Sequence, residues 1–90
     1  MNNERRKAIK AILIKLDQLA SDADEIRGEI NDVQDDEQSY YDAMPESLQD
    51  SEKGGKSEAA IEQLGEALSV VEDIGGEIDS AKLALEEASS

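Results

Sequence analysis

The ionisable side chains set the first limit on the chemistry that this chain can perform. Its 90 residues include 23 Asp and Glu and 9 Lys and Arg, with no His and no Cys. Acid-base or nucleophilic catalysis would therefore need carboxylates, Lys, Tyr or Ser in a buried pocket that shifts their pKa values. A chain this short forms one small domain at most and closes no large core. We expect a protein that is not an enzyme.

Two groups of carboxylates, at residues 22–25 and 35–37, have to be tested as metal ligands. Counted from Asp22, the first group fails the calcium-loop pattern. Arg27 stands where that pattern requires glycine, and Val33 stands where it requires the closing acidic residue. The absence of His removes the usual di-iron bundle site. We expect no metal and no other cofactor.

The charge distribution is the feature with most functional content. The formal net charge is -14, although the first fifteen residues carry a local excess of positive charge from Arg5, Arg6, Lys7, Lys10 and Lys15. Such an acidic chain repels nucleic acid and anionic membranes and attracts basic protein surfaces. The candidate partner-binding residues are Asp35, Asp36, Tyr41, Asp42 and Glu46. The alternative is that the charges form a solvated surface that keeps the protein soluble.

Heptad spacing of apolar residues predicts the elements that hold these side chains. In the first half of the chain the row is Ile9, Ile12, Leu16, Leu19, Ala23, Ile26, Ile30, Val33, Glu37, Tyr40 and Met44, with one charged break. In the second half it is Ile61, Leu64, Leu68, Val71, Gly75, Ile78, Lys82 and Leu85, widened by Ala60, Ala67, Ile74, Ala81 and Ala88. The spacing predicts a coiled-coil-like seam between helices over about 4–43 and 57–87.

The segment at about 44–56 should form the corner between the two helices. Pro45 stops the first helix and suits the start of a single helical turn, while Gly54 and Gly55 free the chain to enter the second helix. Ser57 is the expected N-cap of that helix. We expect one domain over residues 1–90, an all-α antiparallel hairpin in which the numbers of facing residues add up to about 101. Gly75 and Gly76 predict close packing or a modest kink, with a hinge as the alternative.

An apolar belt near the N-terminus predicts self-association. Its members are Ile9, Ile12, Leu13 and Leu16, with Ile14 alongside, and the belt is wider than one partner helix covers. In the expected register the second helix ends before it reaches Ile9. We therefore expect a homodimer that closes into a four-helix bundle, or a target protein on that face.

The phrases Tyr41-Asp42, Pro45-Glu46, Leu48-Gln49 and Ser51-Glu52-Lys53-Gly54 stand together in the corner. With the Ala-Ile-Glu-Gln-Leu and Leu-Glu-Glu-Ala phrases that follow, the chain from about Lys7 onward resembles small acidic helical proteins of phages, prophages and other mobile elements of Gram-positive bacteria, which generally have no assigned function. The resemblance implies a mobile-element origin and no catalytic residue. Gly65, Gly75 and Gly76 depart from the Glu-rich second helix of that group.

These features lead to two hypotheses about function. The first is a cytoplasmic protein that binds the basic surface of a host nucleic-acid-binding protein and inhibits it as a DNA mimic, with a CRISPR-type nuclease as one target. The second is a structural or oligomerisation module whose partner is a second copy of itself. The apolar cluster around Ile12 is too short and too closely flanked by charge to cross a membrane.

Overall fold

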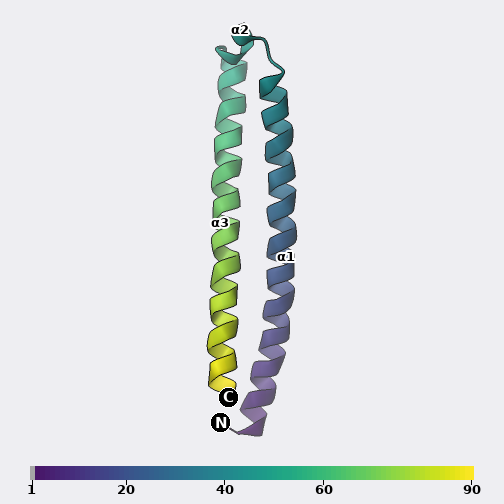
Figure 1. Cartoon of the computed structure of the whole chain (residues 1–90), viewed down its shortest axis with the longest axis vertical. Helices are drawn as coiled ribbons and strands as arrows, with labels where there is room; N and C mark the ends of the chain where they lie inside the picture. The colour runs from purple at the N-terminus through teal and green to yellow at the C-terminus, as the bar shows by residue number, and fades with distance from the viewer. Residues whose placement is uncertain (1) are drawn as a thin grey trace.

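Two long antiparallel helices joined by a short helical corner make up the computed structural model, which describes residues 2–90 (Figure 1). Helix α1 spans Asn3–Asp42, α2 spans Glu46–Gln49 and α3 spans Glu52–Ser89. The hairpin measures 68 × 15 × 13 Å, and the start of α1 lies beside the end of α3 (Figure 1). The prediction of an all-α antiparallel helical hairpin is confirmed.

Local signals account for both ends of α1, close to the predicted bounds. The side chain of Asn2 caps the helix by accepting a hydrogen bond from the backbone N–H of Arg5 at 2.9 Å. The helix ends two residues before Met44, which is buried under the corner, because Pro45 cannot continue it. A single helical turn, α2, follows Pro45 as the sequence predicts.

The start of α3 was predicted wrongly. The helix begins at Glu52 behind Ser51, five residues before the predicted start, so Gly54 and Gly55 are helical. A Cβ on Gly54 would overlap the backbone carbonyl of Gln49, whereas a Cβ on Gly55 would meet nothing within 4 Å. Gly54 therefore allows the first turn of α3 to pack directly on the backbone of α2, and its role is close approach instead of flexibility.

The register between the helices also differs from the prediction. The predicted sum of facing residue numbers was about 101. In the structure Lys82 pairs with Asp17 and Tyr41 with Glu58, which both give a sum of 99. The hydrogen bond from Gln34 to Ile61 gives a sum of 95. The shift and the longer α3 bring Ser89 beside Ile9, which is 9% exposed. The prediction that Ile9 lies beyond the end of the second helix was wrong.

Two heptad-spaced rows of α1 pack on α3. One is the predicted row of Ile9, Leu16, Ala23, Ile30, Glu37 and Met44, all buried or half-buried. The other contains Leu13, Ala20, Gln34 and Tyr41, which are half-buried, instead of the predicted row of Ile12, Leu19, Ile26, Val33 and Tyr40. On α3 the predicted seam is confirmed, because each of its members from Ile61 to Leu85 is buried or half-buried. The helix α3 thus packs beside the apolar stripe of α1 and not on its centre.

A polar pair occupies the seam at the charged break. The hydroxyl of Ser57, only 3% exposed, donates a 2.7 Å hydrogen bond to the half-buried carboxylate of Glu37. Ser57 therefore lies inside α3 and is not its N-cap. A buried polar group needs its partner, so this bond favours the alignment that places Ser57 opposite Glu37.

We predict that Ser57→Ala lowers the free energy of unfolding by about 1–2 kcal/mol, because it removes a hydrogen bond to a half-buried carboxylate. Adding Glu37→Leu should recover the loss, since an apolar pair leaves no unsatisfied group. Thermal and urea unfolding followed by circular dichroism measure both effects. Ser69→Ala, at an exposed position of α3, is the control and should cause no loss. Equal stability of the Ser57 and Ser69 variants would show that the polar pair contributes nothing.

The two adjacent glycines at the start of α3 should respond oppositely to alanine. Gly55→Ala should stabilise the hairpin by up to about 1 kcal/mol through helix propensity. Gly54→Ala should destabilise it, because its Cβ overlaps the Gln49 carbonyl and the corner must shift. The two unfolding midpoints should therefore move in opposite directions, and movement in the same direction would contradict the close packing of α3 on α2.

Candidate interaction surfaces

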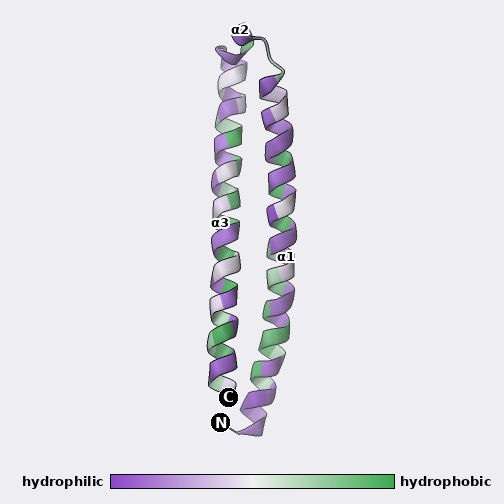
Figure 2. Ribbon diagram, in the orientation of Figure 1, coloured by the Kyte–Doolittle hydropathy of each residue, from purple (hydrophilic) through white to green (hydrophobic). Residues whose placement is uncertain are grey.

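One side of the hairpin is apolar along the whole length of α1. Its residues there are 43% to 54% exposed and recur every seven positions, as Ile12, Leu19, Ile26, Val33 and Tyr40. The corresponding row of α3 is Ala60, Ala67, Ile74, Ala81 and Ala88. We call these ten residues the apolar face. Figure 2 shows apolar residues in both long helices, concentrated toward the end where the termini meet.

The two rows lie on the same side of the hairpin. Each begins three positions after a seam residue, and in two antiparallel right-handed helices this offset turns both rows toward one side. The corner end of the face supports this placement, because the ammonium of Lys53, seven residues before Ala60, lies 5.6 Å from the ring centroid of Tyr40. The apolar face is therefore continuous across α1 and α3.

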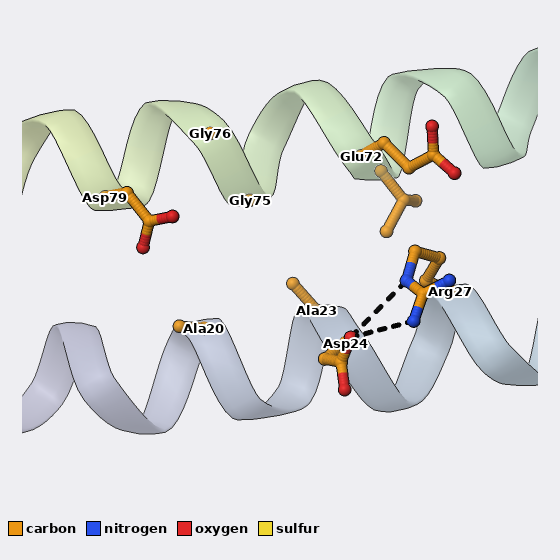
Figure 3. A pocket seen from close by; sticks show the side chains of 9 residues that line it. Ala20, Ala23, Asp24, Arg27, Glu72, Gly75, Gly76 and Asp79 are labelled. Atoms are coloured by element: carbon orange, nitrogen blue, oxygen red, sulfur yellow. Dashed lines mark hydrogen bonds and ion pairs between the residues drawn. The ribbon is translucent and has the colours of Figure 1, made fainter.

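The opposite side holds an acidic groove between the helices. The groove has a volume of about 350 Å³ and is lined by Ala20, Ala23, Asp24, Arg27, Val71, Glu72, Gly75, Gly76 and Asp79 (Figure 3). The groove is open because small residues line it. The helix α3 is continuous through Gly75 and Gly76, and a Cβ on either glycine would meet nothing within 4 Å. Arg27 pairs with Asp24 at 3.0 Å, which leaves the carboxylates of Glu72 and Asp79 as excess negative charge.

The three groove carboxylates are not among the predicted partner-binding residues. Asp24, Glu72 and Asp79 each directly follow a seam residue, namely Ala23, Val71 and Ile78. Charges in that heptad position on both antiparallel helices meet on one side of the hairpin. This regularity is the sequence signal that could have found them.

Each of the four Lys and Arg after residue 15 contacts an acidic or aromatic side chain of the same chain. Arg27 pairs with Asp24, Lys56 with Glu52 at 3.7 Å, and Lys82 with Asp17 at 2.6 Å, while Lys53 lies over Tyr40. Asp17 and its hydrogen bond raise the pKa of Lys82. Residues 16–90 contain 22 Asp and Glu, and three of them take part in these ion pairs. Outside the apolar face and the basic N-terminal segment, the described surface is therefore mainly acidic.

The predicted partner-binding residues lie near the corner but do not share one face. Asp35 and Asp42 are exposed on the same side of α1, one heptad apart, and Asp36 is turned about 100° from Asp35 around the helix. Glu46 is exposed at the start of α2. Tyr41 instead faces α3, where its hydroxyl donates a hydrogen bond to Glu58, and its backbone carbonyl accepts one from Gln49 at 3.1 Å.

The predicted self-association residues are divided by the fold. Ile9 is buried against the end of α3, and Leu13 and Leu16 are half-buried in the seam. Ile12 is the member that lies on the apolar face. Ile14, 68% exposed, points away from both the seam and that face.

Among residues 2–90, no three acidic side chains come together as metal ligands. No helix of the same residues is long and apolar enough to cross a membrane. Comparisons with protein-family models, with curated proteins and with solved structures found no match. The candidate sites are therefore the apolar face and the acidic surface, defined by the geometry of the hairpin alone.

The hydrogen bond to Glu58 raises the pKa of Tyr41 above 10.0, with smaller contributions from desolvation and from nearby carboxylates. Because the folded hairpin holds this proton more tightly than the unfolded chain, the resulting stability is complete below pH 10.0 and is lost as the pH rises through the raised pKa. In a Tyr40→Phe variant, phenolate absorbance should report a titration above pH 10.0. Adding Glu58→Gln should move it down, and an unchanged curve would contradict the assigned hydrogen bond.

Proposed function

We propose that this chain is a non-enzymatic acidic protein that binds a basic, nucleic-acid-binding surface of a host protein and blocks it. The observation that supports this proposal is the engagement of all four cations after residue 15, which leaves most carboxylates directed to solvent. A rod of 68 Å with such a surface offers many simultaneous contacts to Lys and Arg side chains. The mobile-element resemblance makes a host defence nuclease, including one of the CRISPR type, the first class of target.

Linear charge density bears on whether the rod can imitate DNA. A net charge of -14 along 68 Å gives about one negative charge per 4.9 Å, against about one per 1.7 Å in duplex DNA. Two copies side by side would carry about one charge per 2.4 Å, which is close to the duplex value. Mimicry of DNA is therefore a property that we propose for a dimer.

A second candidate function, an oligomerisation module without a host target, is favoured by the apolar face. Ten apolar positions along one side are more than a solvated rod requires, and contiguous apolar surface marks an interaction site. The dimer and its coiled-coil-like four-helix bundle are common to both candidates. Binding of a basic protein distinguishes them.

The first candidate predicts that neutralising Asp35, Asp36, Asp42 and Glu46 with Asn or Gln weakens binding of the target. The purified chain is immobilised, the heparin-binding proteins of a bacterial lysate are applied at about 0.1 M salt, and bound proteins are eluted at about 0.5 M salt, where charges are screened over a shorter distance. A nucleic-acid-binding protein should elute, and the free chain should compete with duplex DNA for it.

The control removes the same number of charges elsewhere, at Glu66, Asp73, Glu77 and Glu87, which are exposed on α3. Circular dichroism checks that both variants remain helical. Weaker binding by the first variant alone places the contact at the corner, and equal weakening by both indicates that the whole rod is used. Absence of any retained nucleic-acid-binding protein would contradict the first candidate and leave the oligomerisation module.

A further inference from the structure

We infer that a second copy of this chain covers the apolar face in an antiparallel orientation, with a two-fold axis near Ile26. The inference rests on the self-association proposed above and specifies its surface and geometry. Ile26 is the middle of the five exposed residues of α1, so a two-fold axis there aligns Ile12 with Tyr40 and Leu19 with Val33 of the other copy.

The direction of the apolar stripe on α1 indicates that two more helices are missing. The helix α3 packs between the rows of α1 that begin at Ile9 and Leu13, whereas the apolar stripe is centred between the rows that begin at Ile9 and Ile12. At about 100° per residue, these two directions around α1 differ by about 50°. In a four-helix bundle each helix directs its stripe at the bundle axis, about 45° from each neighbour, whereas in a two-helix coil the stripe points at the partner. The observed offset fits the bundle, and one further hairpin supplies both missing helices.

The size of the face fits a dimer of this chain. A side of 68 by 15 Å projects an area of about 1,000 Å², and stable interfaces bury about 800 Å² on each partner. The hairpin alone leaves much apolar surface in water, since among residues 2–90 the buried large apolar residues are Ile9, Met44 and Ile78, and each of them keeps 5% to 9% of its surface exposed. A second copy would remove the exposed rows from solvent, and burial of apolar area is the main source of association energy.

Charge selects the antiparallel orientation. Residues 35–58, which surround the corner, contain eight Asp and Glu against two Lys, whereas the start of α1 carries the basic segment from Arg5 to Lys15. A parallel dimer would place both acidic corners at one end. The antiparallel dimer separates them by nearly the 68 Å length of the rod, far beyond a Debye length of about 10 Å. It also brings Lys15, which flanks the apolar face, near Asp36 of the other copy.

Sedimentation of the purified chain, with no partner present, tests the surface. Wild type should sediment with twice the monomer mass of 9.8 kDa. Ile26→Asp should reduce the mass to that of the monomer, while the matched variant Ile14→Asp, at an exposed apolar residue outside the face, should remain dimeric. A monomeric wild type, or equal behaviour of the two variants, would overturn the inference.

Orientation is tested by disulfide formation, which leaves most of the face intact and so does not depend on the Asp variant folding. Ile12→Cys and Tyr40→Cys chains are mixed under oxidising conditions; the native chain has no Cys. Disulfide-linked heterodimers should exceed either homodimer, because aligned Cβ atoms are required. Predominant Tyr40→Cys homodimers would overturn the antiparallel arrangement.

Salt distinguishes this inference from failure of partner binding. Each copy carries -14, so screening between about 0.1 and 0.5 M salt should strengthen the dimer, whereas it should weaken binding to a basic partner. A dimer that dissociates over this range would contradict association through the apolar face. Loss of partner binding with an intact dimer would instead count against the proposed function alone.

Discussion

The structure depends on one constraint, which is that two helices cannot enclose the apolar residues that the chain places on them. Each long helix offers three rows at heptad spacing, and a single neighbour covers two of them. The remaining row stays about half exposed on α1, from Ile12 to Tyr40, and consists mainly of alanine on α3. The separation of the hairpin into an apolar face and an acidic remainder follows from this incomplete enclosure.

Polar contacts decide how the helices align where apolar packing is permissive. Rows of Leu, Ile and Ala tolerate displacement along the seam, because one apolar contact replaces another. The hydroxyl of Ser57 and the carboxylate of Glu37 satisfy each other in only one alignment, and the bond from Gln34 to the Ile61 carbonyl adds to it. Glu37, the one charged residue in the apolar row, therefore helps to set the register between α1 and α3.

Apolar periodicity was sufficient to predict the two long helices, their antiparallel pairing and the seam of α3. It was insufficient at Gly and Ser, because each of these residue types has more than one structural role and periodicity does not distinguish between them. Gly54 and Gly55 were interpreted as a flexible exit, although Gly54 is needed for contact with the Gln49 carbonyl. Ser57 was interpreted as a cap, although it bonds Glu37. The second seam row of α1 was missed because Gln34 and Tyr41 are polar, whereas the stronger apolar signal marks the open side.

The uneven placement of the polar contacts has a kinetic consequence. The contacts that Tyr41, Glu37 and Gln34 make with α3 lie in the half nearest the corner, where the two helices are also closest in sequence, whereas the Lys82–Asp17 ion pair lies in the other half. Closing the chain there costs the least loop entropy, and each further turn is added next to one already formed. We therefore expect the hairpin to form from α2 toward the termini, with its basic, apolar end forming last and fraying first.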